Sequence, residues 1–85
     1  MVLKFDYDSG VVYLPFENIG LFSIRENTSD NNFRVSVYMQ DSNSGWRNAS
    51  SYSTEEKAKA AVEKLYQLYF ENPDRVVTFP LEGDL

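Results

Sequence analysis

The stretch SSYSTEEKAKAAVEKLYQLYFENPD (residues 50–74) decides the fold, because it has helical periodicity and a recognisable start and end. Ser53 is followed three residues later by Glu56, which predicts a capping box at the helix start. Asn72 precedes Pro73, and a residue before proline avoids helical geometry. We therefore predict one helix over about residues 54–71.

One face of this helix is apolar and the opposite face is polar. At about 100° per residue, the apolar stripe consists of Ala58, Ala61, Val62, Leu65, Leu68 and Tyr69. Tyr66 and Phe70 lie beside this stripe, where a single sheet would not cover them. Two explanations are open: either residues 75–80 fold back over the two rings, or another protein chain covers them.

The segments before the helix alternate between apolar and polar residues, as β-strands do. Strands are expected over residues 2–7, 11–16, 21–26, 33–40 and 46–52, and residues 75–80 can add a short final strand or extended segment. Strands followed by a helix predict an α+β fold. We expect an antiparallel β-meander of four to five strands packed against one C-terminal helix.

The length of 85 residues is that of a single domain. We predict that residues 1–80 form this domain and that residues 81–85, LEGDL, are a flexible acidic tail. Gly10 and Gly45 are expected in turns, in the sequences DSG (8–10) and DSNSG (41–45).

Composition excludes several kinds of chemistry. The chain has no histidine and no cysteine, so nucleophilic sites and zinc sites that need these residues cannot form within it. DYDSG and DSNSG lack the spacing of an EF-hand calcium loop. We expect no enzyme activity, no cofactor and no metal site.

The formal net charge of -5 opposes binding to nucleic acid or to an anionic membrane. No apolar run is long enough to span a membrane, and the first residues lack the pattern of a signal peptide. Because the chain also lacks cysteine, we expect a cytoplasmic protein.

Two sets of residues are candidates for contact with a partner. The candidate interface collects exposed rings and apolar groups near the helix, the last segment and a turn: Tyr66, Phe70, Val76, Phe79 and Trp46. The candidate open sheet face mixes cations with a ring, as surfaces that bind single-stranded nucleic acid do: Lys4, Arg34, Tyr38 and Arg47. The simpler interpretation of the second set is a solvated sheet face.

The stretches LPFENIGLFSI (14–24), FRVSVYMQ (33–40) and YSTEEKAKAAVEKL (52–65) together resemble small uncharacterised bacterial and phage-associated proteins. In these proteins a β-meander built around an N-I turn leads into a final helix. The resemblance covers about residues 11–70. It implies the same meander-plus-helix fold and a bacterial or phage origin, and it transfers no activity and no catalytic or binding residue.

The sequence leaves three functions open. The favoured one is a small non-enzymatic module that binds a protein partner or associates with itself, a homodimer being the simplest form. The second is an acidic, phage-encoded inhibitor that occupies a basic groove on a host protein by imitating nucleic acid. The third is binding of single-stranded nucleic acid on the open sheet face.

Overall fold

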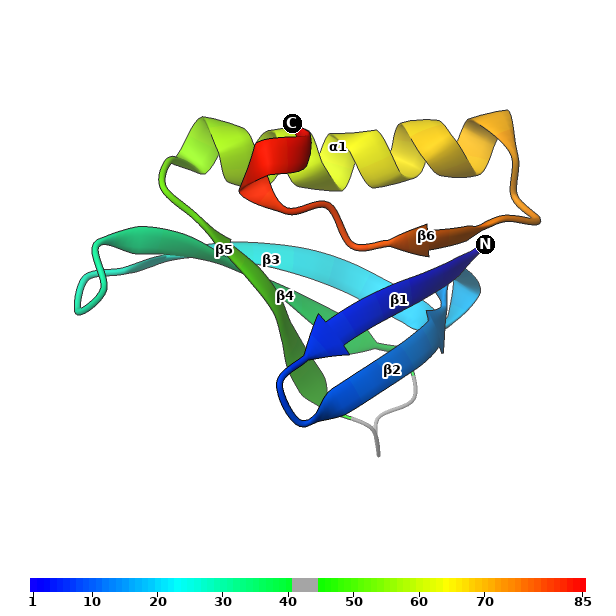
Figure 1. Cartoon of the computed structure of the whole chain (residues 1–85), viewed down its shortest axis with the longest axis horizontal. Coiled ribbons are helices and arrows are strands. Elements are labelled where there is room, and N and C mark those ends of the chain that lie inside the picture. The colour runs from blue at the N-terminus through cyan, green and yellow to red at the C-terminus, as the bar shows by residue number, and fades with distance from the viewer. Residues whose placement is uncertain (41–44) are drawn as a thin grey trace.

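The chain forms two three-stranded sheets that diverge beneath one helix in the computed structural model, which describes residues 1–40 and 45–85 (Figure 1). The first sheet has the order β2-β1-β6, with β1 (Val2–Tyr7), β2 (Gly10–Pro15) and β6 (Val76–Thr78). The second has the order β3-β4-β5, with β3 (Ile19–Asn27), β4 (Asn32–Met39) and β5 (Trp46–Tyr52). Helix α1 spans Glu55–Glu71. The α+β class, the antiparallel strands and the helix are confirmed.

The strands do not form one continuous meander, because the chain changes direction after β2. Pro15 ends β2, and the short 3-10 helix η1 (Phe16–Asn18) carries the buried Phe16 into the core. β3 then pairs with β4, and the opposite edge of β1 is taken by β6, which runs parallel to it. Residues 75–80 therefore pair with their own chain: Val2 N donates to the Arg75 carbonyl, and Phe79 N donates to the Lys4 carbonyl.

Helix α1 is capped one residue later than the sequence predicts. The Thr54 side chain accepts a hydrogen bond from Lys57 N at 3.2 Å, so Thr54 is the N-cap and the Ser53–Glu56 capping box does not form. Ser53 has another partner: its backbone N donates to Glu82 Oε1 at 2.8 Å.

The C-terminal residues, which we expected to form a flexible acidic tail, are packed against the helix. Glu82–Asp84 form a 3-10 turn beside the start of α1 (Figure 1). Two lysines of the helix also contact this turn. Lys57 Nζ lies 3.5 Å from the Glu82 carboxylate, and Lys64 Nζ donates to the Asp84 carbonyl at 2.9 Å. Hydrogen bonds from Ser53 lower the pKa of Glu82. A carboxylate is favoured here because the N-terminus of a helix carries partial positive charge.

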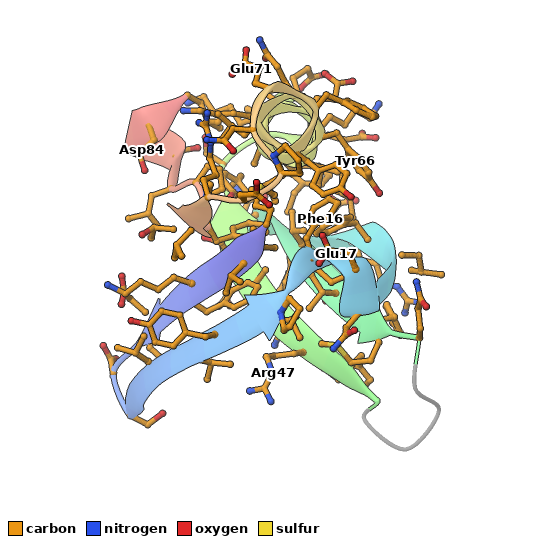
Figure 2. The ribbon with its side chains drawn as sticks, turned by 90° about the vertical axis from the view of Figure 1, so that its right-hand side faces the viewer. Phe16, Glu17, Arg47, Tyr66, Glu71 and Asp84 are labelled. Atoms are coloured by element: carbon orange, nitrogen blue, oxygen red, sulfur yellow. The ribbon has the colours of Figure 1, made fainter. Side chains whose placement is uncertain are left out.

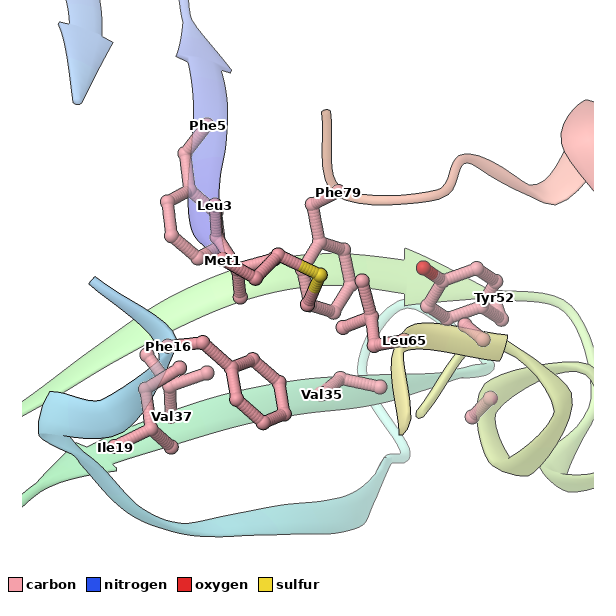
Figure 3. Close-up of a cluster of buried hydrophobic side chains, with 12 residues drawn as sticks. Met1, Leu3, Phe5, Phe16, Ile19, Val35, Val37, Tyr52, Leu65 and Phe79 are labelled. Carbon is pink, nitrogen blue, oxygen red and sulfur yellow. The ribbon is translucent and has the colours of Figure 1, made fainter. Parts of the chain in front are cut away.

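The core lies between the helix and the inner faces of both sheets (Figure 3). Its fully buried members include Leu3 of β1, Val35 of β4 and Leu65 of α1. Ala58 and Ala61 are also buried, and their small side chains allow the helix backbone to approach the sheets.

The two glycines expected in turns both have a positive φ. Gly10 has φ 146° and Gly45 has φ 67°, and a backbone in this region favours glycine because it has no Cβ. The rest of the turn expected over residues 41–45 lies outside the described residues.

Candidate binding face on the second sheet

The second sheet has one face in the core and one face exposed to solvent. Along β4, Val35 and Val37 are buried, and the residues between them point to the opposite side. We call the exposed side the outer face. It carries Leu21, Ser23 and Arg25 of β3, Arg34, Ser36 and Tyr38 of β4, and Trp46 and Asn48 of β5.

The strand register arranges these residues in rows across the sheet. Tyr38 is paired with Trp46, and Arg34 is paired with Arg25. Between these rows, Ser36 Oγ donates to Asn48 Oδ1 at 3.1 Å. The aromatic row and the arginine row are four residues apart along β4, which is about 13 Å in an extended strand.

A hollow of about 370 Å³ on this face joins the two rows. Its lining residues come from all three strands: Arg25, Glu26, Asn27, Arg34, Ser36, Tyr38, Trp46 and Asn48. This volume lies within the range of small-ligand sites, about 300–1,000 Å³. Trp46, the single tryptophan of the chain, is 57% exposed. The face therefore offers rings for stacking and cations for anion binding within one hollow.

The arginine row is an unfavourable arrangement for folding. Like charges directly opposite each other on adjacent strands destabilise a sheet. Arg34 is 3.9 Å from the exposed carboxylate of Asp30, a distance and exposure at which an ion pair contributes little. Among the residues that the structure describes, no carboxylate lies within ion-pair distance of Arg25. A bound anion would relieve this repulsion.

The candidate open sheet face predicted from the sequence is only partly assembled. Arg34 and Tyr38 lie on the outer face, and Trp46, predicted as part of the interface, lies beside them. Lys4 lies on the other sheet, 3.8 Å from the Asp6 carboxylate. Arg47 is paired with the buried Val37, and Figure 2 shows it in the opening between β2 and β5. The prediction that these four residues share one face is therefore wrong.

Tyr66 is partly covered by rings of its own chain, and cover of the two helix rings by another protein chain stays a prediction. Tyr66 packs edge-on against Phe16 at 5.4 Å and against Phe22 at 5.9 Å between ring centroids, as the first pair shows in Figure 2. Residues 75–80 do not cover it, because β6 pairs with β1. Phe70 is 79% exposed and contacts the ring of Tyr69.

The remaining members of the candidate interface do not adjoin these rings. Phe79 is 3% exposed and its ring stacks on Phe5 at 5.4 Å, so it belongs to the core and is not a surface residue. Val76 is 61% exposed on the first sheet, next to Val2. The five residues thus do not form one patch.

The acidic residues of the helix and the C-terminal turn are interleaved with lysines. Lys59 lies 3.2 Å from Glu55, and Lys57 lies 3.5 Å from Glu82. An inhibitor that imitates nucleic acid needs a continuous series of negative charges. This mixed surface supports such an inhibitor less than the outer face supports a protein-binding module.

Within residues 1–40 and 45–85, no group of three or more histidine, cysteine, aspartate or glutamate side chains is placed to hold a metal ion. In the same ranges, no helix combines the length and apolar character needed to cross a membrane.

Comparison with known proteins adds no relative. No protein-family model, curated protein or solved structure matches this chain.

Proposed function

We propose that the protein is a non-enzymatic binding module whose outer face recognises an extended, acidic segment of another protein. The observation that carries the proposal is the pairing of Arg25 with Arg34 and of Tyr38 with Trp46 across one hollow. Charge-assisted hydrogen bonds from guanidinium groups to carboxylates are among the stronger polar contacts in proteins. Tyrosine, tryptophan and arginine are also the residues most enriched in the energetically important parts of protein interfaces.

The spacing of the rows defines the partner segment. A carboxylate bound by the arginines and an apolar or aromatic side chain against Trp46 would be about 13 Å apart, the length of four residues in an extended chain. The segment should therefore carry a glutamate or aspartate four residues from an aromatic residue.

The charge balance favours such a segment over single-stranded nucleic acid. A polyanion gains affinity by neutralising many phosphates with lysine and arginine. Here the outer face supplies two arginines, one of which is near Asp30, on a chain of net charge -5. A segment with one or two carboxylates needs only these two cations.

The test uses Trp46 as its reporter, because this tryptophan lies in the hollow. The probe is a capped peptide of threonine residues with a phenylalanine and a glutamate four residues apart. Its binding is measured by the change in Trp46 fluorescence. We expect saturable binding that weakens with added salt. Replacing the peptide glutamate by glutamine, or moving it two residues closer to the phenylalanine, should weaken binding by about ten-fold, which is the loss of one charge-assisted hydrogen bond.

Variants of the protein separate the outer face from general charge effects. Arg25→Gln should weaken peptide binding by about ten-fold. Lys4→Gln removes the same charge from the other sheet and should leave the affinity unchanged. Equal losses in both variants, or no response of Trp46 to the acidic peptide, would contradict the proposal. Tighter binding of a labelled single-stranded oligonucleotide would indicate nucleic acid, and a dimer that Arg25→Gln dissociates would indicate a second copy of the chain.

A further inference from the structure

A second hollow, of about 520 Å³, opens between the two sheets. We call it the inter-sheet cleft. Its described lining residues are Val12, Tyr13, Leu14, Asn18, Met39, Gln40 and Arg47. None of them lines the hollow on the outer face, so the two sites are distinct.

The cleft follows from the way the sheets diverge. Figure 2 shows both sheets spreading apart on the side away from α1, with Arg47 in the opening. Near the helix the space between the sheets is filled by core side chains. Farther away, Val12 and Leu14 of the first sheet and Met39 of the second are only half-buried, and they give the cleft apolar walls.

Arg47 occupies a position where a sheet normally places an apolar residue. Its partner in the strand register is Val37, which is fully buried on the inner face. Among the described residues, no carboxylate lies within ion-pair distance of Arg47. It lies near Tyr7, whose hydroxyl donates to the Asn48 carbonyl at 2.7 Å. Burial raises the pKa of Tyr7, and the nearby guanidinium partly offsets this effect.

We infer that the inter-sheet cleft binds a small amphipathic carboxylate, with its hydrocarbon part between Val12, Leu14 and Met39 and its carboxylate at Arg47. An arginine can hold a carboxylate through two parallel hydrogen bonds. The side-chain amides of Asn18 and Gln40 add polar groups to the lining. Apolar walls with a few polar groups are the usual composition of small-molecule sites, and the volume lies within their range of about 300–1,000 Å³.

The test compares two probes that differ only in the head group: octanoate and octan-1-ol. In a titration followed by NMR, octanoate should shift the amide signals of Val12, Leu14 and Met39 to saturation. Octan-1-ol should bind about ten-fold more weakly, because its neutral hydroxyl cannot form the paired hydrogen bonds of an ion pair with Arg47. This comparison uses the unmodified chain, so it does not depend on any variant folding.

A pair of variants then tests whether Arg47 is the cation that binds the carboxylate of octanoate. Arg47→Met replaces the guanidinium by a long uncharged side chain and should abolish the preference for octanoate over octan-1-ol. Arg25→Met makes the same change on the outer face and should leave that preference intact. Shifts that do not saturate, equal affinity for both probes, or an unchanged preference in Arg47→Met would overturn the inference. So would shifts centred on the Trp46 side chain, which would show adventitious binding to the outer face.

The two proposals can fail separately. Loss of peptide binding in Arg25→Gln concerns the outer face, and loss of carboxylate preference in Arg47→Met concerns the cleft. Neither result changes the interpretation of the other site, because no described residue lines both hollows.

Discussion

Replacing Phe5 by alanine is expected to lower the free energy of unfolding by about 3–5 kcal/mol, the range for removing a large buried ring. Phe5 is 2% exposed, and its ring stacks on Phe79 at 5.4 Å and on Tyr7 at 6.1 Å. It lies on β1, the strand that holds β2 and β6 together. A chain of this size buries a small core, and domains are stable by only about 5–15 kcal/mol in total. The variant should therefore be partly unfolded under conditions in which the parent chain is folded.

Phe70→Ala provides the matched control, because it removes the same ring from a side chain that is 79% exposed. We expect its free energy of unfolding to stay within about 0.5 kcal/mol of the parent value. Urea denaturation followed by circular dichroism measures both variants. A large loss for Phe70→Ala would show that the ring is covered in solution, and a small loss for Phe5→Ala would contradict the packing of the first sheet.

Local patterns were sufficient to predict most of the elements. The alternation of Phe33, Val35, Val37 and Met39 with polar residues predicts the strand that became β4, and its buried face follows directly. The helix also follows from its own residues, since Asn72 does end it before Pro73. These features depend on contacts between residues that are close in sequence.

Long-range pairing could not be predicted in the same way. Val2 pairs with Val76, and nothing in either short segment specifies a parallel partner so distant along the chain. Phe16 is buried because η1 turns the chain into the core, whereas the sequence pattern placed it at the end of the strand expected over residues 11–16. The division into two sheets depends on the pairing of β1 with β6 and on the turn of the chain at η1.

The same limit explains which parts of the site were found. The alternation of apolar and polar residues along a strand shows which of its residues share a face. It does not show which strands share a sheet. Arg34 and Tyr38 were correctly placed together because both are on β4. Lys4 was grouped with them wrongly because β1 belongs to the other sheet. Arg25 was missed because its place beside Arg34 is set by the register between β3 and β4.

The second large effect on stability is expected at Tyr52, the last residue of β5. Its side chain is 1% exposed, and its hydroxyl donates to the carbonyl of Pro80, which is also buried. Tyr52→Phe keeps the ring and removes this donor, which leaves the carbonyl without its partner. A buried polar group left without a hydrogen bond costs about 1–3 kcal/mol. The loss should also loosen the C-terminal turn, because Pro80 connects it to β6.

The pH dependence of stability shows whether Tyr52 stabilises the fold through the hydrogen bond of its hydroxyl or only through the packing of its ring. Burial is the main cause that raises the pKa of Tyr52 from 10.0 to about 12, and the carboxylates of Asp84 and Glu82 act in the same direction. The unfolded chain therefore loses this proton at a lower pH than the folded chain does. The stability contributed by the hydroxyl is complete below pH 10 and falls as the pH rises from 10 toward 12.

Denaturation curves measured at neutral pH and at several values between pH 10 and 12 test this expectation. Tyr52→Phe should be less stable than the parent chain at neutral pH, and the difference should shrink as the pH rises. Burial also raises the pKa of Tyr7, so Tyr7→Phe is the control for the contribution of that tyrosine to the pH dependence. If the parent chain and Tyr52→Phe lose stability in parallel above pH 10, then the Tyr52 hydroxyl is solvated. In that case the contact with Pro80 does not hold the C-terminal turn in place.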